Sequence, residues 1–448
     1  MAVIGASEGP NSLGTRYLGG ILRHGFEGAI HAVNPKYDEV MGLACYDSIL
    51  DVPDPVDTAV LSVREDLVER TLTECAERGL AGAVIFAGGY REIGPEGAER
   101  ERRLTELARE LGIRFIGPNS PGFMNFVDRA VITATSVAFR ESFPPGGRLG
   151  VIAQSGGVAG IIAERAMDRG LGLSFMLCSG NEADFDTPEA VRFLADDPDT
   201  EAIAMYYEGV GDRERLVEAW RHASEREVPV IVFTPGSSQA SKHAAASHTG
   251  SAPGEDHEFA QLAGELGVIR VLDLDEMLEA AIAIPRLPRS SCDRVLLLTT
   301  SGGGGVLAAD AMGRAGISLP ELATELQEEL GSVLRPIGSF RNPVDMTSDP
   351  VQNPPSFQKS IEIVSRSVDH DVIVVSITVQ GPELATRMAD TIAANDAAQE
   401  GRLVVVWYAG AMSDVGRKIL RKAGITVFDT PRTLATSLAG ARTWNARG

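Results

Sequence analysis

The chain has 448 residues, 44% of them hydrophobic, and a formal net charge of −21, which predicts several folded domains and argues against nucleic acid as a partner. No apolar run approaches the ~18 residues of a membrane-spanning helix, and the N-terminus lacks the basic region and long apolar core of a secretory signal. The four cysteines lie far apart with no C-x-x-C spacing, so we expect no metal site, no disulfide framework and a cytoplasmic location.

The first 125 residues alternate short apolar runs with amphipathic stretches. The runs AVI, AIHAV, DTAVLSV, GAVIF and IRFIG are typical of buried strands, and LVERTLTECAERG and GAERERRLTELARELG are typical of helices. This alternation predicts βαβ units around a parallel sheet that ends near Asn125. Residues 126–148 include the turn-forming stretch FPPGG and are expected to be an irregular linker.

Two further regions, 149–284 and 294–448, begin with the same pattern. Each opens with an apolar strand, continues with Ser-Gly-Gly and enters an Ala-rich helix that ends in glycine. Downstream, AIAMYYEG matches VIVVSITVQG, and VPVIVFTPG matches RLVVVWYAG. We interpret the regions as two copies of one flavodoxin-like unit joined by a linker at 285–293, although any two βα units share some of these features.

The first strand leads into the glycine-rich turn GASEGPNSLG, which contains Gly5, Ser7 and Gly14. Free N–H groups at the start of the following helix suit a phosphate. The glycine spacing differs from the G-x-G-x-x-G of dinucleotide enzymes, and structural turns also explain such glycines. Lys36 follows the second strand and is either a phosphate ligand or a solvated surface residue.

The fifth strand ends in GPNSPG, residues 117–122. Its two prolines and two glycines predict a rigid turn around Asn119, and a shaped loop without large apolar side chains does not build a core. Ligands of open α/β sheets bind beyond the carboxyl ends of the strands. A binding role for this turn is therefore expected.

Three strand ends of the second region are expected at one edge of its sheet. The first strand ends at Ser155, Gly156 and Gly157 before a helix, which indicates a second anion site. The third ends at Glu208, and the fourth enters a loop of roughly 20 small residues that carries His248. An imidazole near a carboxylate and an anion site is a candidate nucleophile toward phosphorus, whereas the alternative is that His248 is merely polar surface.

The motifs VIGAS, VNPKYDEVMG, GPNSPG, AQSGG, SGNEADFD, YYEG, AAASHTG and NPVDMT occur in this order and span essentially the whole chain. With these motifs the sequence resembles the nucleoside-diphosphate-forming acyl-CoA synthetases, relatives of succinyl-CoA synthetase. The resemblance implies an α/β fold with a Rossmann-like CoA-binding domain at 1–125, a ligase domain at 149–284 and a second flavodoxin-like ligase domain at 294–448.

The resemblance also implies roles for individual residues. His248, in the motif SHTG, is the residue that becomes phosphohistidine, and Glu208 supports its ring. The residues implied to lie at the phosphate are Ser155, Gly156 and Gly157, with Gln380 and Gly381 nearby. The residues implied to contact coenzyme A are Gly5, Ser7, Gly14, Lys36, Asn119 and Pro121.

The implied reaction interconverts acyl-CoA, ADP and phosphate with a small carboxylic acid, CoA and ATP through an acyl phosphate and phosphohistidine. No segment matches an ATP-grasp domain, so the chain looks like an α-type subunit in a hetero-oligomer. Its separate ATP-grasp β-type partner would bind ATP or ADP and Mg²⁺. The sequence departs from the family in two places. The chain begins inside its first strand, which suggests a truncated or a misassigned start, and Arg64 stands where the family commonly has proline, which puts the adenine contacts in doubt.

Two other functions compete with this one. An NAD(P)-linked oxidoreductase is disfavoured by the glycine spacing and by the absence of an acidic residue at the end of the second strand, HAVNPK. A non-catalytic CoA- or acyl-CoA-binding regulatory protein that lacks the ATP-grasp half stays open. Retention of both Glu208 and His248 argues against this second alternative.

Overall fold

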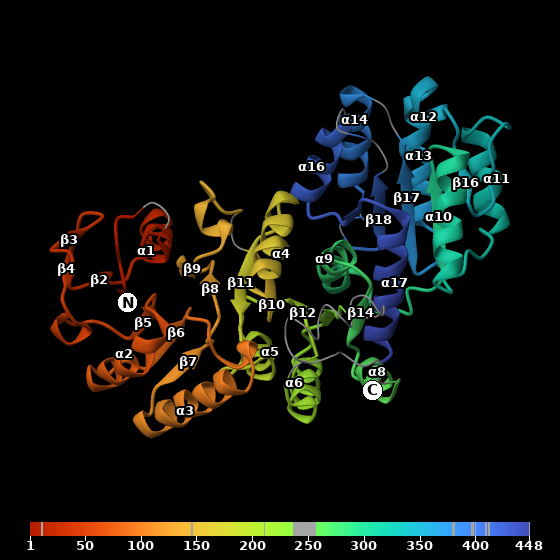
Figure 1. The fold of residues 1–448 in the computed structure, drawn as a ribbon. Helices are drawn as coiled ribbons and strands as arrows, with labels where there is room; N and C mark the ends of the chain where they lie inside the picture. Colours follow the sequence, from red (N-terminus) through yellow and green to blue (C-terminus); the bar gives the residue numbers. More distant parts are fainter. Residues whose placement is uncertain are drawn as a thin grey trace. The chain divides into compact units, whose positions relative to one another are not determined.

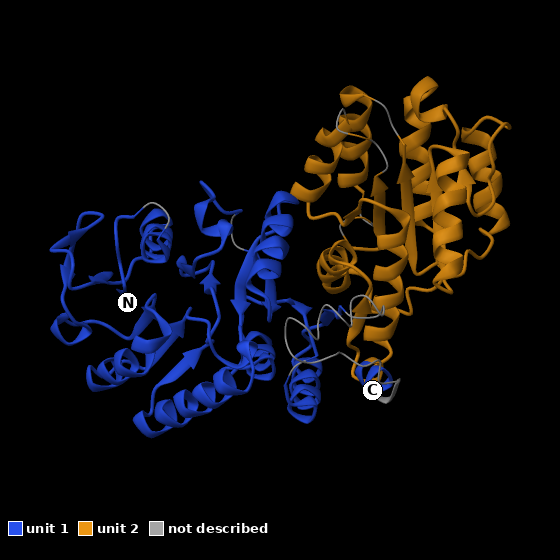
Figure 2. Cartoon of the chain, viewed as in Figure 1, with its two compact units in different colours: residues 1–263 blue, residues 264–448 orange. Residues whose placement is uncertain are grey.

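The computed structural model describes residues 1–9, 12–144, 147–209, 211–235, 257–378, 381–395, 398, 400–407, 410 and 413–447, with the backbone alone at 257 and 258. The chain divides into two compact units, residues 1–263 and 264–448 (Figure 2). Sheets of mainly parallel strands with packed helices form both units, which confirms the predicted α/β class (Figure 1).

The first sheet of unit 1 has the strand order β3-β4-β2-β1-β5-β6-β7. The apolar runs predicted as strands form it, and β1 pairs in parallel with both β2 and β5. Its strands are β1 (Ala2–Ile4), β2 (His31–Val33), β3 (Glu39–Val40), β4 (Leu43–Tyr46), β5 (Thr58–Leu61), β6 (Gly82–Ile85) and β7 (Arg114–Ile116). Its helices are α1 (Leu13–Arg23), α2 (Glu65–Glu77) and α3 (Pro95–Leu111).

The second sheet of unit 1 contains the order β13-β12-β10-β11-β8-β9. Residues 126–147 were expected to be irregular, yet they contain β9, which pairs antiparallel with β8 and extends this sheet. The strands are β8 (Gly122–Asn125), β9 (Ala130–Thr133), β10 (Leu149–Ala153), β11 (Leu173–Cys178), β12 (Ala202–Tyr206) and β13 (Val230–Phe233). The helices are α4 (Gly156–Asp168), α5 (Thr187–Asp196), α6 (Arg213–Glu225) and α8 (His257–Glu265).

Unit 2 contains a parallel sheet of order β16-β15-β17-β18-β19. The strands of this sheet are β15 (Val295–Thr299), β16 (Val344–Asp345), β17 (Val372–Ile377), β18 (Leu403–Trp407) and β19 (Val427–Phe428), and residues 264–448 also contain β14 (Ile269–Val271) outside this sheet. Its helices are α9 (Leu274–Ala283), α10 (Gly302–Arg314), α11 (Thr324–Val333), α12 (Asp349–Gln352), α13 (Pro354–Ser365), α14 (Pro382–Ala393), α16 (Asp414–Lys422) and α17 (Pro431–Asn445).

The two regions predicted to be copies share one topology. Four strands of each copy follow the same spatial order when they are numbered along the chain. This order is β13-β12-β10-β11 in unit 1 and β18-β17-β15-β16 in unit 2. In each, the first strand of the copy lies between the second and the third, which is the arrangement of flavodoxin-like sheets. Each first strand runs directly into a helix that begins after a serine, at Ser155 or at Ser301. The edge where ligands bind in such sheets is therefore duplicated.

Candidate functional site

A cavity of about 710 Å³ lies in unit 1 where loops of the first sheet face the start of α4. Its lining includes six of the residues that the sequence singled out, namely Asn119, Pro121, Ser155, Gly156, Gly157 and Glu208. The other lining residues are Leu13, Arg16, Phe86, Arg91, Glu92, Ala134, Thr135, Ser136, Gln154, Gly160, Gly180 and Asn181. The cavity thus joins the predicted CoA-contacting turn to the predicted phosphate-binding turn.

The helix α4 starts directly at the cavity. Ser155 precedes it in an extended conformation, its side chain makes no capping hydrogen bond, and no acidic residue occupies the first turn. A Cβ atom on Gly156 would lie 2.5 Å from Cγ of Pro121, whereas one on Gly157 would meet nothing within 4 Å. The N–H groups and the positive end of the helix dipole therefore face the cavity with space for an anion.

Glu208 follows β12 at the same edge and is held from two sides. Its backbone N–H donates to Oε1 of Gln154 at 2.6 Å, and Gln154 is itself buried. The hydroxyl of Tyr206 hydrogen-bonds the Glu208 side chain, and burial together with the negative charge of Glu208 raises the pKa of Tyr206 to about 12. Tyr206 therefore stays a neutral donor that orients the carboxylate.

His248 and Gln380 lie outside the described residues. Gly381 belongs to unit 2, where it precedes α14 with a φ of 95°. The cavity lining does not include the four remaining predicted CoA contacts, Gly5, Ser7, Gly14 and Lys36.

The glycines of the first turn have a packing role that can be measured. A Cβ atom on Gly5 would lie 2.3 Å from the carbonyl oxygen of Ser62, and one on Gly14 would lie 2.0 Å from the carbonyl oxygen of Gly5. Both positions therefore require glycine so that α1 can approach the strands closely. The hydroxyls of Ser7 and Ser12 contact each other, and Ser12 caps α1 by accepting from Thr15 N at 3.1 Å.

Lys36 lies in the turn after β2, and its side chain is exposed. Asn34 anchors this turn, because its Nδ2 donates to the carbonyl of Ala6 at 2.7 Å while its Oδ1 accepts from Lys36 N at 3.1 Å. The lysine backbone is thereby fixed next to the glycine-rich turn, which suits a cationic side chain that serves a phosphate there.

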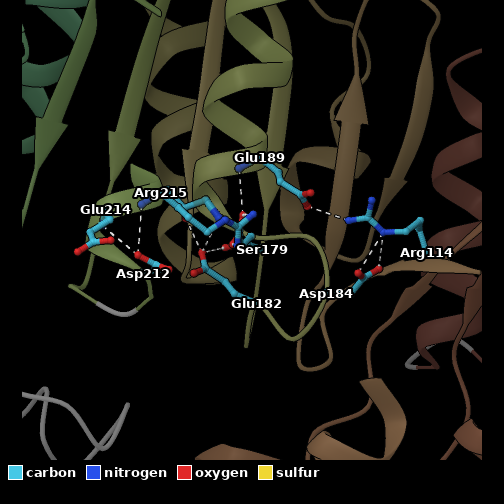
Figure 3. A network of polar contacts seen from close by, with 10 residues as sticks. Arg114, Ser179, Glu182, Asp184, Glu189, Asp212, Glu214 and Arg215 are labelled. Carbon is cyan, nitrogen blue, oxygen red and sulfur yellow. Dashed lines mark hydrogen bonds and ion pairs between the residues drawn. The ribbon is translucent and has the colours of Figure 1, made fainter. Parts of the chain in front are cut away.

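The segment 179–187, which is the motif SGNEADFD followed by Thr187, lies near the cavity although no role was predicted for it. The segment follows β11 of the second sheet, and its Asp184 forms an ion pair at 2.9 Å with Arg114 of β7 in the first sheet (Figure 3). Glu182 lies inside it, and its Oε1 accepts from Ser179 Oγ at 2.7 Å and also contacts the Thr187 hydroxyl. Burial raises the pKa of Glu182 above its usual value.

Twelve lining residues were not predicted, among them Gln154, Arg16 and Asn181. Gln154 stands directly before the Ser-Gly-Gly pattern, and Arg16 follows Gly14 by two positions, so both were visible as neighbours of a predicted site. Asn181 lies within the motif SGNEADFD. These side chains come from segments far apart in the sequence, and only the tertiary fold shows that they share a cavity.

Within the parts of the chain that the structure describes, no group of three or more His, Cys, Asp or Glu side chains is placed to hold a metal ion. No helix among those same residues is long and apolar enough to cross a membrane.

Comparison with known proteins places this architecture. The family model of a CoA binding domain matches residues 1–125, that of a succinyl-CoA ligase like flavodoxin domain matches 146–284, and that of a Ligase-CoA domain matches 295–447. Fold and cavity together thus define a protein of the succinyl-CoA ligase type with a CoA-binding domain.

Individual relatives are more specific. The chain is 32% identical to the acetate–CoA ligase (ADP-forming) II subunit alpha of Pyrococcus furiosus over 98% of this chain and 94% of that one. It is 32% identical to the acetate–CoA ligase (ADP-forming) I of Archaeoglobus fulgidus, of which it spans 60%. The solved acetyl-coenzyme A synthetase 1 of Candidatus Korarchaeum cryptofilum, in complex with phosphate and ADP, superimposes with a TM-score of 0.87 at 27% identity and 99% and 95% coverage of the two chains. The chain belongs to the family of ADP-forming acyl-CoA synthetases, in the part that corresponds to their α subunits.

Proposed function

We propose that the chain is the α-type subunit of an ADP-forming acid–CoA ligase that interconverts acyl-CoA, ADP and phosphate with a carboxylic acid, CoA and ATP. The observation that carries this proposal is the single cavity in which the start of α4 and Glu208 face the turn of Asn119 and Pro121. A site for phosphate and a site for a CoA thioester are thereby adjacent. We retain the division into domains at 1–125, 149–284 and 294–448, with linkers between them, and a cytoplasmic location as parts of this proposal.

The first step takes place between the two turns. Phosphate bound at Ser155, Gly156 and Gly157 attacks the thioester carbonyl, so that the C–S bond breaks and a C–O bond to phosphate forms. The thiolate takes up a proton and leaves as CoA. The uncapped N–H groups of α4 lower the free energy of the phosphate because they donate to its oxygens.

In the second step a ring nitrogen of His248 attacks the phosphorus of the acyl phosphate. The P–O bond breaks, a P–N bond forms, the acid departs as carboxylate and the ring loses a proton. Glu208, oriented by Gln154 and Tyr206, would hold the ring in the tautomer whose free nitrogen attacks, and would balance its positive charge. Phosphohistidine would then pass the phosphoryl group to ADP, which a separate ATP-grasp β-type subunit would bind together with Mg²⁺, so that the P–N bond breaks and ATP forms.

Labelling tests this proposal. The purified chain, supplied with acetyl-CoA and radioactive inorganic phosphate, should take up an acid-labile and base-stable phosphate, and His248→Asn should abolish the uptake. ADP and Mg²⁺ added to the labelled chain without a partner should leave the phosphate in place. Phosphate found on another residue, or ATP formed by the chain alone, would refute the assignment.

A non-catalytic CoA-binding protein is the second candidate. It predicts binding of CoA to the cavity with no phosphate uptake under any of these conditions. The contacts of Glu208 favour the enzyme, because a protein that only binds CoA has no use for a carboxylate oriented at the phosphate end of the cavity.

A further inference from the structure

Asn181 ties the two halves of the cavity together. It follows β11 in the ligase half, and its side chain is buried. Its Oδ1 accepts from Nδ2 of Asn119 at 3.2 Å, while its Nδ2 donates to Oε2 of Glu92 at 2.6 Å and to Oε2 of Glu101 at 2.9 Å. One amide thus contacts three separate elements of the CoA-binding half: the turn after β7, the segment after β6 and helix α3.

The electrostatics make these contacts specific for an amide. Glu101 is 6% exposed and forms an ion pair with Arg91. Burial works to raise the pKa of Glu92, but hydrogen bonds from Asn181 and from backbone N–H groups outweigh it and lower the pKa below the usual value. Two carboxylates therefore converge on one NH₂ group, which supplies a hydrogen to each.

The backbone on either side of Asn181 also hydrogen-bonds to the turn that contains Asn119. Asn181 N donates to the carbonyl of Pro118 at 2.9 Å, and Ala183 N donates to that of Gly117 at 3.1 Å. At Gly180, whose φ is 62°, an added Cβ would lie 2.6 Å from the carbonyl oxygen of Pro118. The segment and the GPNSPG turn are therefore in direct contact along their main chains.

We propose that Asn181 is a positioning residue that sets the separation between a CoA thioester held at the Asn119 turn and a phosphate held at the Ser155 turn. This inference rests on the proposed function. Attack of phosphate on the thioester carbonyl needs the reacting atoms about 3–3.5 Å apart, and a misplacement of about 1 Å costs on the order of 10²-fold in rate. Asn181 lines the cavity, but both of its amide hydrogens go to Glu92 and Glu101 and its oxygen accepts from Asn119, so its effect on the reaction would pass through the Asn119 turn.

Two ways of phosphorylating His248 separate this role from a purely structural one. Acetyl-CoA plus inorganic phosphate requires both halves of the cavity, whereas acetyl phosphate supplies the phosphoryl group directly and needs no CoA. In Asn181→Ala we expect labelling from acetyl-CoA and phosphate to slow on the order of 10²-fold. Labelling from acetyl phosphate should stay within about twofold of the parent, because it does not depend on the position of the Asn119 turn.

Two further variants sharpen the test. Asn181→Asp keeps the shape but places a third carboxylate beside Glu92 and Glu101, so it should be at least as slow as Asn181→Ala in the acetyl-CoA assay. Combining Asn181→Asp with Glu92→Gln exchanges donor and acceptor across one contact, and should recover part of the lost rate. Asn445→Ala is the matched control in unit 2, where the Asn445 amide donates to the carbonyls of Pro288 and Ser290. It should leave both labelling rates unchanged.

The outcomes distinguish the two proposals. Equal losses from both phosphoryl donors in Asn181→Ala and Asn181→Asp, or no loss from either, would overturn the positioning role while the proposed function stands. If Asn181→Ala does not fold, the paired Asp/Gln variant decides, because failure to recover any rate contradicts the role. A parent chain that is labelled from neither donor refutes the proposed function, and the positioning role falls with it.

Discussion

The turn at Ser155 in unit 1 and the turn at Ser301 in unit 2 occupy the same place in two sheets of the same strand order. The strand pairing shows which residues of the two copies correspond. Ala153 pairs with Tyr206 in the first copy, and Thr299 pairs with Ser376 in the second. Glu208, two residues after Tyr206, therefore corresponds to Thr378, two residues after Ser376. The two copies can be compared atom by atom.

One hydrogen bond is the same in both copies. In each copy, the side chain of the residue before the serine accepts a hydrogen bond from the backbone N–H of a residue that follows the neighbouring strand. In unit 1, Gln154 Oε1 accepts from Glu208 N at 2.6 Å, and in unit 2, Thr300 Oγ1 accepts from Thr378 N at 3.1 Å. The scaffold that fixes the strand end has been kept, while the side chain that it presents has changed from a carboxylate to a hydroxyl.

The helix starts differ as well. The first residue of α10, Gly302, faces a carboxylate, since a Cβ there would lie 2.9 Å from Oδ2 of Asp345. The first residue of α4, Gly156, faces Pro121 instead. A negative charge beside a helix N-terminus competes with an anionic ligand for the same dipole. The two copies therefore differ at this edge in two places, with Glu208 against Thr378 at the strand end and Pro121 against Asp345 beside the first residue of the helix.

The largest expected effect comes from the carboxylate itself. Glu208→Gln should fold normally and slow labelling of His248 by about 10²-fold or more, because an amide cannot balance the charge that develops on the ring. The matched change in the other copy, Thr378→Val, should leave labelling nearly unchanged. Thermal melting checks folding, and phosphate uptake checks activity. Normal labelling of Glu208→Gln would reduce Glu208 to a surface residue at a strand end.

The second prediction concerns adjacent glycines with opposite surroundings. Gly156→Ala drives a Cβ against the rigid ring of Pro121, 2.5 Å from Cγ, so it should destabilise unit 1 by about 1–3 kcal/mol and separate the two turns. Gly157→Ala meets nothing within 4 Å and should be neutral or stabilising by up to about 1 kcal/mol. Melting temperatures and labelling from acetyl-CoA are the measurements. Equal behaviour of the two variants would contradict the close contact of α4 with the turn.

Most strands and helices of this scaffold could be predicted from the sequence, because each one depends on a pattern of neighbouring residues. Apolar runs bounded by glycine gave the strands of the parallel sheets, and the two Ser-Gly-Gly patterns identified both copies. Chain order alone predicted Ser155 and Glu208 at one edge of the sheet, and in the structure both residues line one cavity. The strand β9 was missed, because RAVITATSV is short and follows no helix pattern.

The missing part of the site depends on register and tertiary contact. Gln154 and Asn181 lie within recognised motifs, yet Gln154 accepts from a residue 54 positions away and Asn181 accepts from one 62 positions away in sequence. No periodicity connects such positions. The role predicted for His248 stays a prediction, because this residue lies outside the described part of the chain.

A third prediction concerns buried acids in the two copies. Cys178 pairs with Ala153, and Asp345 pairs with Thr299; Glu182 and Asp349 each lie four residues further along the chain. Asp349 is paired with Arg335, whereas the hydrogen-bond donors that lower the pKa of Glu182 are Thr187, Ser179 and Gln154. Burial outweighs them and raises the pKa.

The raised pKa of Glu182 determines how the free energy of unfolding changes with pH. The folded state holds the Glu182 proton more tightly than the unfolded state, whose pKa is about 4.3. The free energy of unfolding should therefore fall as pH rises above about 4.3 toward the raised pKa. Glu182→Gln removes this fall, so the variant should gain stability relative to the parent as pH rises from about 4.3 toward neutrality. Unfolding midpoints measured across this range test it, with the exposed Glu77→Gln as control. A difference that does not change with pH would contradict the burial effect.

The smallest expected effect is at Lys36, which belongs to the first sheet and has no counterpart in the duplicated turns. Asn34 fixes its backbone beside Ala6, so its ammonium can reach a CoA phosphate only as an exposed point charge. Such a pair is worth up to about 1 kcal/mol, or roughly fivefold in affinity, and weakens with salt. Lys36→Ala should therefore bind CoA about fivefold more weakly in calorimetry at low salt. Dephospho-CoA should be affected less if the 3′-phosphate is the partner, and Lys359→Ala, an exposed lysine of unit 2, should change neither affinity. Equal affinities of Lys36→Ala and the parent for CoA would return this residue to the solvated surface, and would show that the glycine-rich turn binds CoA without help from a cation at this position.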